Sequence, residues 1–388
     1  MKCFGLSADT SRYILSPMDS TGYSAWLEID LGIIRQNVKE LLRISQTEVM
    51  AIVKANGYGH GAAEVAKASV QAGAAWCGVA RLEEAISLRH AGLDCQILVL
   101  GYTSPERVVE AIHNDISLTI YDRQVGEEYA EQAKRLGGGL RLHIKVDTGM
   151  GRLGVPPDEA IEFVESLSNR PELIVEGIFT HFARADEPQP QTTMEQLHLF
   201  DELVKQLRKD GISPKYIHAA NSAAILNYPA ACYDLVRPGI SLYGLPPSPD
   251  THLPAGIKPA LAWKTRLTSV RAFPPGHGIS YGHVYSTSKV ERIGSIAIGY
   301  ADGFRRVTGN IALVRGKRVP VVGRVCMDQC MLQLDGVPDA AIGDEVVLLG
   351  GQGNECISAD EIAGRWGTIN YEVVCGLSAR LPRIHLNP

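Results

Sequence analysis

Residues 50–61 read MAIVKANGYGHG, an apolar run that ends at a single lysine and continues into three glycines. This pattern is typical of a buried parallel strand, and it places Lys54 at the carboxyl end of that strand, where ligands gather in α/β proteins. Burial disfavours the ammonium form, so a lysine held there offers a free amine to a carbonyl compound. The glycines leave backbone N–H groups open to an anion, and Tyr58 adds a hydroxyl donor. The alternative is a lysine that extends into water beside an ordinary turn.

A strand-then-helix rhythm surrounds this stretch. Residues 25–29 alternate as a half-buried strand, and Asp30 is expected to cap a helix that runs to about residue 44. Eight strand-like runs follow, with helical patterns between most of them: 48–54, 76–80, 96–101, 117–121, 141–147, 174–181, 216–220 and 233–237. Eight such units predict a (β/α)8 barrel. A doubly wound open sheet is the alternative, but it requires a G-x-G-x-x-G fingerprint after its first strand, and the sequence has none there.

Prolines cluster at residues 246–249 and 254–259, which suits a domain boundary. Beyond them the pattern changes to strands with short turns, expected at 261–273, 292–299, 311–315, 318–334 and 344–349, with short helices at 360–366 and 371–376. The chain is therefore expected to consist of an N-terminal extension (1–24), an α/β barrel (25–255) and a C-terminal mostly-β domain (256–388).

Composition and charge restrict the partners. A net charge of −5 argues against a nucleic acid or an anionic membrane surface, which would need a basic face. The eight cysteines show no zinc-like pairing, and the one close pair, Cys326 and Cys330, is expected to share one face of a strand. We expect reduced thiols in a cytoplasmic protein. Residues 1–24 hold no apolar segment of signal-peptide length, and no later run reaches membrane-spanning length.

The segment KANGYGHG at residues 54–61 closely resembles the cofactor-lysine motif of the bacterial alanine racemases, and further segments match that family in the same order from about Ala25 to the end. The resemblance implies that Lys54 holds pyridoxal 5'-phosphate and that the strand at 25–29 pairs into the C-terminal domain. It also implies that the cofactor's phosphate is bound by Tyr58, Ser222, Gly239, Ile240 and Tyr371. Taken alone, Ser222 would be an ordinary helix cap.

Arg237, in the segment Arg237-Pro-Gly-Ile240, is the residue that the family places at the pyridine nitrogen. Many pyridoxal enzymes place a carboxylate there, which keeps the nitrogen protonated and the ring strongly electron-withdrawing. A guanidinium donates a hydrogen bond but not readily a proton, so the ring withdraws electrons more weakly. The negative charge left at the substrate's α-carbon is then short-lived, which favours racemisation over transamination. An isolated Arg-Pro-Gly turn would more often form a surface ion pair.

Racemisation needs an acid/base group on each face of the reacting carbon, and Lys54 can serve one face. The segment Ile279-Ser-Tyr-Gly282 resembles the family segment whose tyrosine, here Tyr281, serves the other face from the partner subunit of a homodimer. A phenol needs positive neighbours to act as a base near neutral pH, and Arg152 is the candidate by resemblance. Arg152 is also implied to contact the ring and the substrate carboxylate. On spacing alone, Tyr281 would be a turn tyrosine between glycines.

Other matches are supporting, and each has an ordinary structural alternative. His181 resembles the histidine beside the ring and Arg237, although a buried core histidine is the simpler interpretation. Met327 and Asp328 resemble the partner-subunit segment at the substrate carboxylate, and Tyr300 in IGYADG resembles the tyrosine that narrows the substrate entrance. Lys145 matches a position often carbamylated in the family, where the added carboxylate would steady Arg152; an unmodified lysine is the alternative.

The resemblance implies a pyridoxal-phosphate racemase that interconverts L- and D-alanine, forms a homodimer and supplies D-alanine for peptidoglycan. One rival is a decarboxylase of the same architecture, which would more naturally place a carboxylate where Arg237 is expected and would lack the opposed tyrosine. The other rival is a non-catalytic pyridoxal-phosphate carrier, but such proteins are usually a barrel without a second domain. Serine or a broader range of small amino acids stays open as substrate.

Overall fold

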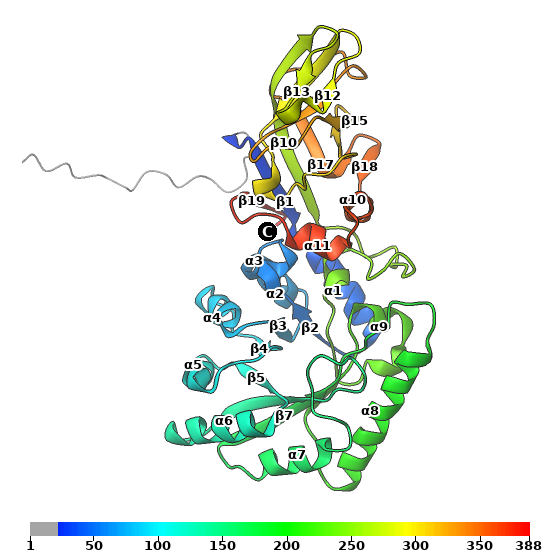
Figure 1. The fold of residues 1–388 in the computed structure, drawn as a ribbon. Coiled ribbons are helices and arrows are strands. Elements are labelled where there is room, and N and C mark those ends of the chain that lie inside the picture. Colours follow the sequence, from blue (N-terminus) through cyan, green and yellow to red (C-terminus); the bar gives the residue numbers. More distant parts are fainter. Residues whose placement is uncertain (1–21) are drawn as a thin grey trace, which may run out of the picture.

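The computed structural model describes residues 22–388, so most of the extension expected at 1–24, with Cys3, lies outside the described residues. Two units follow each other along the described chain: a sheet surrounded by helices and, beyond it, a domain made mainly of strands (Figure 1). This arrangement confirms the predicted fold class. The exact domain boundaries stay predictions.

The first described elements connect the two units. Strand β1 (Ala25–Asp30) buries Trp26, Leu27 and Ile29, and it pairs antiparallel with β10 (Leu261–Phe273) and parallel with β19 (Arg383–Leu386). Helix α1 (Leu31–Ser45) follows without a break because the Asp30 carboxylate accepts the N–H of Ile33 at 3.0 Å. The chain therefore starts in the strand domain and enters the barrel through α1.

Eight parallel strands form the barrel sheet, in the order β8-β7-β6-β5-β4-β3-β2-β9. Arg237 closes it, because its backbone N–H donates to the carbonyl of Ala220 at 2.9 Å across the gap between β8 and β9. The strands are β2 (Glu48–Ile52), β3 (Trp76–Val79), β4 (Gln96–Val99), β5 (Ser117–Ile120), β6 (Leu140–Lys145), β7 (Leu173–Phe179), β8 (Tyr216–His218) and β9 (Leu235–Val236). The helices that cover them are α3 (Ala62–Gln71), α4 (Leu82–His90), α5 (Val108–His113), α6 (Arg123–Arg135), α7 (Ala160–Ser168), α8 (Gln191–Lys209) and α9 (Ser222–Asn227).

Every barrel strand ends one or two residues before the sequence pattern predicts. The apolar pattern continues because most of these residues remain buried or partly buried, and several, such as Val146 and Thr180, still donate a backbone hydrogen bond to the neighbouring strand. At the end of β2, for example, Val53 is buried and its N–H still donates to the carbonyl of Gly78 at 2.9 Å, but the one-turn helix α2 (Lys54–Tyr58) begins directly after it. The carboxyl ends of the strands are therefore short, irregular segments that can aim side chains at a common point.

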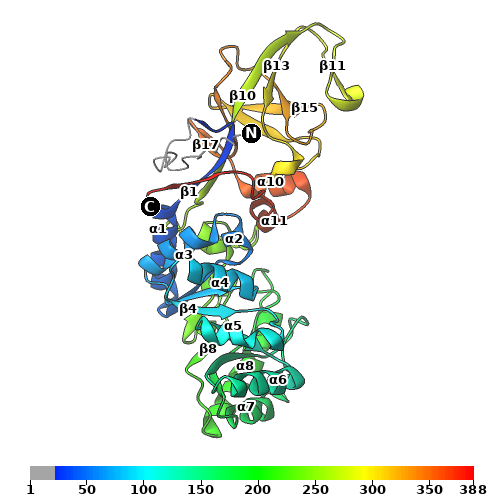
Figure 2. The same ribbon diagram turned by 90° about the vertical axis from the view of Figure 1, so that its left-hand side faces the viewer.

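The second unit is built on a nine-stranded sheet in the order β18-β17-β14-β15-β16-β13-β10-β1-β19. Its further strands are β13 (Glu291–Ile296), β14 (Ile311–Val314), β15 (Lys317–Val322), β16 (Cys330–Gln333), β17 (Glu345–Gln352) and β18 (Glu355–Ile357). A small hairpin, β11 (Gly278–Ile279) with β12 (Tyr285–Ser286), stands apart from the sheet, and helices α10 (Ala359–Trp366) and α11 (Asn370–Cys375) face the barrel (Figures 1 and 2).

One expectation in this unit was wrong. Residues 318–334 do not form a single strand but the antiparallel neighbours β15 and β16, joined by a turn over residues 323–329. Gly323 permits the turn with a φ of +69°, a conformation that glycine adopts at little cost. Cys326 therefore lies in the turn and Cys330 in β16, so the two thiols do not share a strand face. The seven cysteines within residues 22–388 are all free.

No helix in the described part of the chain is both long and apolar enough to cross a membrane.

The exit from the barrel offers a test of the fold. Gly244 has a φ of +79°, and a Cβ there would lie 1.8 Å from the carbonyl oxygen of Lys258. Gly92 has nearly the same φ, +82°, but no atom within 4 Å of its Cβ position. Gly92→Ala is expected to lower the free energy of unfolding by about 1 kcal/mol through φ strain alone, and Gly244→Ala by at least about 3 kcal/mol. Urea unfolding curves for the two variants measure the difference, and equal losses would show that the Lys258 contact does not constrain the chain.

Candidate functional site

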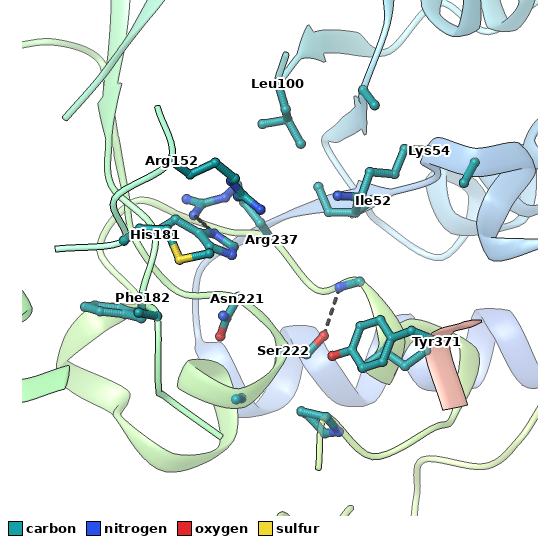
Figure 3. A pocket seen from close by; sticks show the side chains of 18 of the residues that line it. Ile52, Lys54, Leu100, Arg152, His181, Phe182, Asn221, Ser222, Arg237 and Tyr371 are labelled. Atoms are coloured by element: carbon teal, nitrogen blue, oxygen red, sulfur yellow. Dashed lines mark hydrogen bonds between the residues drawn. The ribbon is translucent and has the colours of Figure 1, made fainter. Parts of the chain in front are cut away.

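A cavity of about 570 Å3 opens at the carboxyl ends of the barrel strands (Figure 3). Residues from most of the strand ends reach it, although they are spread over more than 300 positions of the chain. Among those that line it are Lys54, Tyr58, Lys145, Arg152, His181, Ser222, Arg237, Gly239, Ile240 and Tyr371. The structure thus brings together all the residues expected to bind the cofactor. Arg152 and Lys145, which were expected to have other roles, line the same cavity.

Lys54 is held by an unusual backbone turn. The next three residues, Ala55, Asn56 and Gly57, all have left-handed conformations with φ between 54° and 62°. Each non-glycine residue in that region costs about 1–2 kcal/mol, so the turn needs external support. The Glu84 carboxylate supplies it by accepting the N–H of Ala55 at 2.7 Å and, on the neighbouring strand end, the N–H of Ala80 at 2.8 Å. The carboxylate ties the turn after β2 to the end of β3 and fixes the start of the lysine side chain.

The amine of Lys54 lies in a region that disfavours its charge. Burial and then the positive charge of Arg152 lower the pKa of Lys54. The same two causes lower the pKa of Lys145 to about 8, and Arg237 adds to them. The cavity therefore concentrates basic groups, and its two lysines lose their protons more readily than lysines in water. Such a site suits an anionic ligand and amine chemistry.

Arg152 is presented by a loop after β6 that Asp147 shapes. The Asp147 carboxylate accepts backbone N–H groups from Gly149, Met150 and Gly151 at 2.7 to 3.1 Å. Burial alone would raise the pKa of Asp147, but these N–H donors lower it, so the carboxylate stays charged. These hydrogen bonds within the loop stabilise its conformation, and the loop places Arg152 in the cavity wall.

Arg237 is almost completely buried, and both of its terminal nitrogens are hydrogen-bonded within the barrel. Nη1 donates to Nδ1 of His218 at 2.8 Å, while Nη2 donates to the carbonyls of Thr180 at 2.7 Å and Ala219 at 3.0 Å and lies 3.2 Å from Nδ1 of His181. The remaining nitrogen, Nε, has no acceptor among residues 22–388. Burial lowers the pKa of Arg237 to about 9, so the guanidinium still carries its proton at neutral pH. The N–H of Nε is therefore free for a ligand.

The opposite end of the cavity is rich in hydroxyl groups. Ser222 Oγ accepts the N–H of Gly239 at 2.9 Å, as the dashed line in Figure 3 shows, and that of Ser241 at 3.2 Å. Gly239 must be a glycine, because a Cβ there would lie 2.5 Å from the hydroxyl of Tyr58. Burial raises the pKa values of Tyr58 and Tyr371, so both phenols remain hydrogen-bond donors. Hydroxyl and N–H donors converge here as a phosphate group requires.

The remaining predicted residues lie elsewhere. Tyr281, Met327 and Asp328 line a separate hollow of about 560 Å3 on the strand domain, next to the β11–β12 hairpin, which lies far from the barrel (Figure 2). Tyr281 is 68% exposed and Met327 54%. Tyr300 donates its N–H to the carbonyl of Cys326 at 3.0 Å, beside Met327, but it lines another hollow, together with Glu372 and Gly376. Within one chain, the residues expected to bind cofactor and those expected to arrive from a partner are thus separated.

Some residues of the site were not predicted. Asn221, not Ser222, caps α9 by accepting the N–H of Ala224 at 3.0 Å, and it also lines the cavity. A polar residue immediately after a strand is the signal that could have identified it. Glu84 gave no such signal, because its role depends on the approach of two strand ends.

The profile described as "Alanine racemase, N-terminal domain" matches residues 29–247, and "Alanine racemase, C-terminal domain" matches residues 260–385. An alanine racemase of Symbiobacterium thermophilum is 46% identical over 363 residues, covering 93% of this chain and 96% of that protein.

Solved structures agree with the sequence relatives. The alanine racemase of Bacillus anthracis with bound L-Ala-P superimposes with a TM-score of 0.89 at 41% identity and covers 96% of both chains. A histidine racemase from Leuconostoc mesenteroides has a TM-score of 0.88 at 30% identity, covering 94% of this chain and 99% of that one. Profile matches over both units and identities above 40% across most of the length show that the chain belongs to the alanine racemase family.

Proposed function

We propose that the protein interconverts L- and D-alanine with pyridoxal 5'-phosphate held on Lys54. The observation that carries this proposal is the meeting, in one cavity, of a buried lysine of lowered pKa with Arg237 and a cluster of hydroxyl donors. An alanine racemase with bound L-Ala-P has the same fold at 41% identity, which supports alanine as the substrate.

The residues present fit this cofactor. Lys54 Nζ would bind its aldehyde carbon, and Arg237 Nε–H, which has no acceptor within the described residues, would donate to its pyridine nitrogen. Tyr58, Ser222 and Tyr371, with the backbone at Gly239 and Ile240, would hold its phosphate. His181, hydrogen-bonded to the other face of the Arg237 guanidinium, would pack beside the ring. The positive charges of Arg152 and Arg237 would balance the phosphate and the substrate carboxylate.

When bound, pyridoxal phosphate withdraws electrons from the amino acid and thereby acidifies its Cα–H bond. Lys54 Nζ, freed when the substrate amine takes its place on the cofactor, would remove or return the Cα proton on one face, and Tyr281 Oη would do so on the other. One group takes a proton while the opposite group gives one, so the configuration inverts. Because Arg237 donates a hydrogen bond rather than a proton to the ring, proton return to Cα is favoured over transamination.

Tyr281 reaches the cavity only from a second copy in this proposal. Tyr281, Met327 and Asp328 lie on the exposed half of the strand domain, away from the barrel cavity of their own chain, and Tyr300 is exposed beside Met327. A homodimer would place this half over the partner's barrel, with Met327 and Asp328 at the substrate carboxylate and Tyr300 narrowing the entrance. A crowded pocket of this kind prefers small side chains.

We also propose that the reaction takes place in the cytoplasm and supplies D-alanine for peptidoglycan. One structural relative is a histidine racemase, so histidine should be tested as a substrate beside alanine. Serine, which the sequence left open, should be tested with them.

The two proposed bases give the first test of function. Lys54→Ala is expected to abolish racemisation of alanine in both directions, because the cofactor attachment and one base are lost. Tyr281→Phe keeps the ring but removes the hydroxyl, and we expect kcat to fall by about 10²–10⁴-fold. Tyr23→Phe, at an exposed tyrosine outside both hollows, is the matched control and should retain wild-type turnover. Polarimetry from each enantiomer measures the rates, and wild-type activity of Tyr281→Phe would exclude the phenol as a base.

Mixing the two inactive variants tests the shared site. In a mixed dimer, one site combines an intact Lys54 with an intact Tyr281 from the other chain, and the second site has neither. Refolding Lys54→Ala and Tyr281→Phe together in equal amounts should therefore restore about a quarter of wild-type activity, since half of the dimers are mixed and half of their sites are complete. If each site used groups of a single chain, the mixture would stay inactive.

Lys145 is proposed to carry a carbamate that steadies Arg152. Carbon dioxide reacts with the neutral amine, and the pKa of about 8 makes that form far more abundant at pH 8 than for a lysine in water. The modified fraction should rise as pH increases from 7 to 9, and intact mass measured with and without bicarbonate should show the addition of one carbon dioxide. Lys145→Met is the control. An unchanged mass in bicarbonate at pH 9 would leave Lys145 an ordinary lysine.

A further inference from the structure

A line of buried polar side chains continues from Arg237 away from the cavity. Arg237 Nη1 lies 2.8 Å from His218 Nδ1, and His218 Nε2 lies 2.9 Å from His143 Nδ1. His143 Nε2 then points towards Glu176, with 3.5 Å between Nε2 and Oε2. Both imidazoles are fully buried. The line connects β9, β8, β6 and β7 through the interior of the barrel.

The direction of this chain of hydrogen bonds follows from Arg237, because a guanidinium has donors only. His218 Nδ1 must accept, so its proton sits on Nε2 and is donated to His143 Nδ1. By the same argument the proton of His143 sits on Nε2 and needs an acceptor. Burial lowers the pKa values of both histidines, which keeps each ring neutral with a single N–H.

Glu176 is the acceptor within reach. Within the described residues, His143 Nε2 and Arg141 Nε are both buried without a hydrogen-bond partner, and both face Glu176 Oε2, at 3.5 and 3.9 Å. Ser117 Oγ donates to the same oxygen at 3.0 Å. Burial raises the pKa of Glu176, but His143, Ser117 and Arg141 together bring it below its ordinary value, so the group is a carboxylate.

The backbone is shaped to bring this carboxylate inward. The pairing of β6 with β7 shifts between Leu142 and His143, which face Val175 and Gly177, so Glu176 is an extra residue in a β-bulge. Bulges are rare between parallel strands, and they re-aim a side chain. Gly177 completes the arrangement, since a Cβ there would lie 2.3 Å from His143 Nδ1. Neither feature is needed to pair the strands.

Aromatic packing fixes the two rings. Phe179 stacks on His218 with centroids 4.6 Å apart and 5° between the planes, and Trp76 meets the edge of His143 at 5.2 Å. The Arg237 guanidinium lies 5.2 Å from the same Phe179 ring. A change at the Glu176 end therefore has few ways to relax except through the hydrogen bonds to Arg237.

We propose that Glu176 is a positioning residue for racemisation: it ends the chain His143–His218–Arg237 and so fixes the tautomers that hold the guanidinium with Nε–H towards the cavity. This rests on the proposed function only for its kinetic consequence. The arrangement of protons can be measured independently.

The test uses the full-length protein loaded with pyridoxal phosphate and labelled with ring-¹⁵N histidine. In wild type, His143 and His218 should both show a bare Nδ1 and a protonated Nε2. Glu176→Leu removes the acceptor, so we expect the Nε2 proton signal of His143 to shift and the second tautomer to be populated in both rings. Glu176→Gln retains a carbonyl acceptor and should restore the wild-type pattern. Glu176→Asp, which withdraws the carboxylate by one methylene, serves if the leucine variant does not fold.

Asp115→Asn is the matched control. Asp115 pairs with the same Arg141 guanidinium but contacts no histidine, and asparagine tolerates its φ of +54°. It should leave the ¹⁵N pattern and the kinetics unchanged. For Glu176→Leu we expect kcat for alanine to fall roughly tenfold with little change in KM.

Unchanged tautomers in both Glu176→Leu and Glu176→Asp would overturn the proposal, as would a glutamine variant that matches the leucine variant. Altered tautomers with wild-type kcat would show that Glu176 orders the histidines without positioning Arg237 for the reaction, and so would also overturn it. A wild-type protein that does not racemise alanine would instead refute the proposed function, and the ¹⁵N pattern would still decide whether Glu176 ends the chain.

Discussion

The site depends on a lysine amine, that of Lys54, whose protonation is opposed by burial and by nearby positive charges. Lys54 lies at a strand end where burial and the charge of Arg152 oppose its protonation, and Lys145 experiences the same two effects. Few compensating carboxylates line the cavity, so the positive charges are not neutralised internally. An anionic ligand would relieve this repulsion, and a carbonyl compound would find a reactive amine. The repulsion between these positive charges lowers the stability of the folded chain, but it favours the binding of an anionic ligand.

Closure of the barrel makes this arrangement possible. Strand β9 pairs with β2, and the N–H of Ile52 donates to the carbonyl of Pro238 at 3.2 Å, so the end of the barrel segment meets its beginning. Lys54 and Arg237 are neighbours in the cavity although 183 positions separate them in the chain (237 − 54). An open sheet would leave them on opposite edges. The site therefore follows from topology as much as from local sequence.

Much of this could be predicted from the sequence. Apolar runs with regular spacing gave the barrel and the strand domain, and the glycines after Lys54 indicated an unusual turn. The turn over residues 323–329 was missed because apolar residues continue into it, and the left-handed conformation of Ala55 has no compositional signal. The bulge at Glu176 does have a signal in the sequence, because a Glu-Gly pair interrupts an otherwise apolar strand. The roles of Glu84 and Glu176 depend on contacts between neighbouring strands, which the sequence pattern alone does not predict.

The separation of the two sets of predicted residues has a physical consequence. Many of the predicted residues in the barrel cavity are buried, and Arg237 and Ser222 are hydrogen-bonded within one chain, so much of this geometry exists before any second copy arrives. Tyr281 and Met327 are instead exposed on the strand domain. In the proposed function, cofactor binding would then depend on one chain, while proton transfer on the second face would depend on assembly. Exposed apolar and phenolic side chains around a hollow are costly for a lone chain, and a second copy that covers them would gain both burial and a complete site.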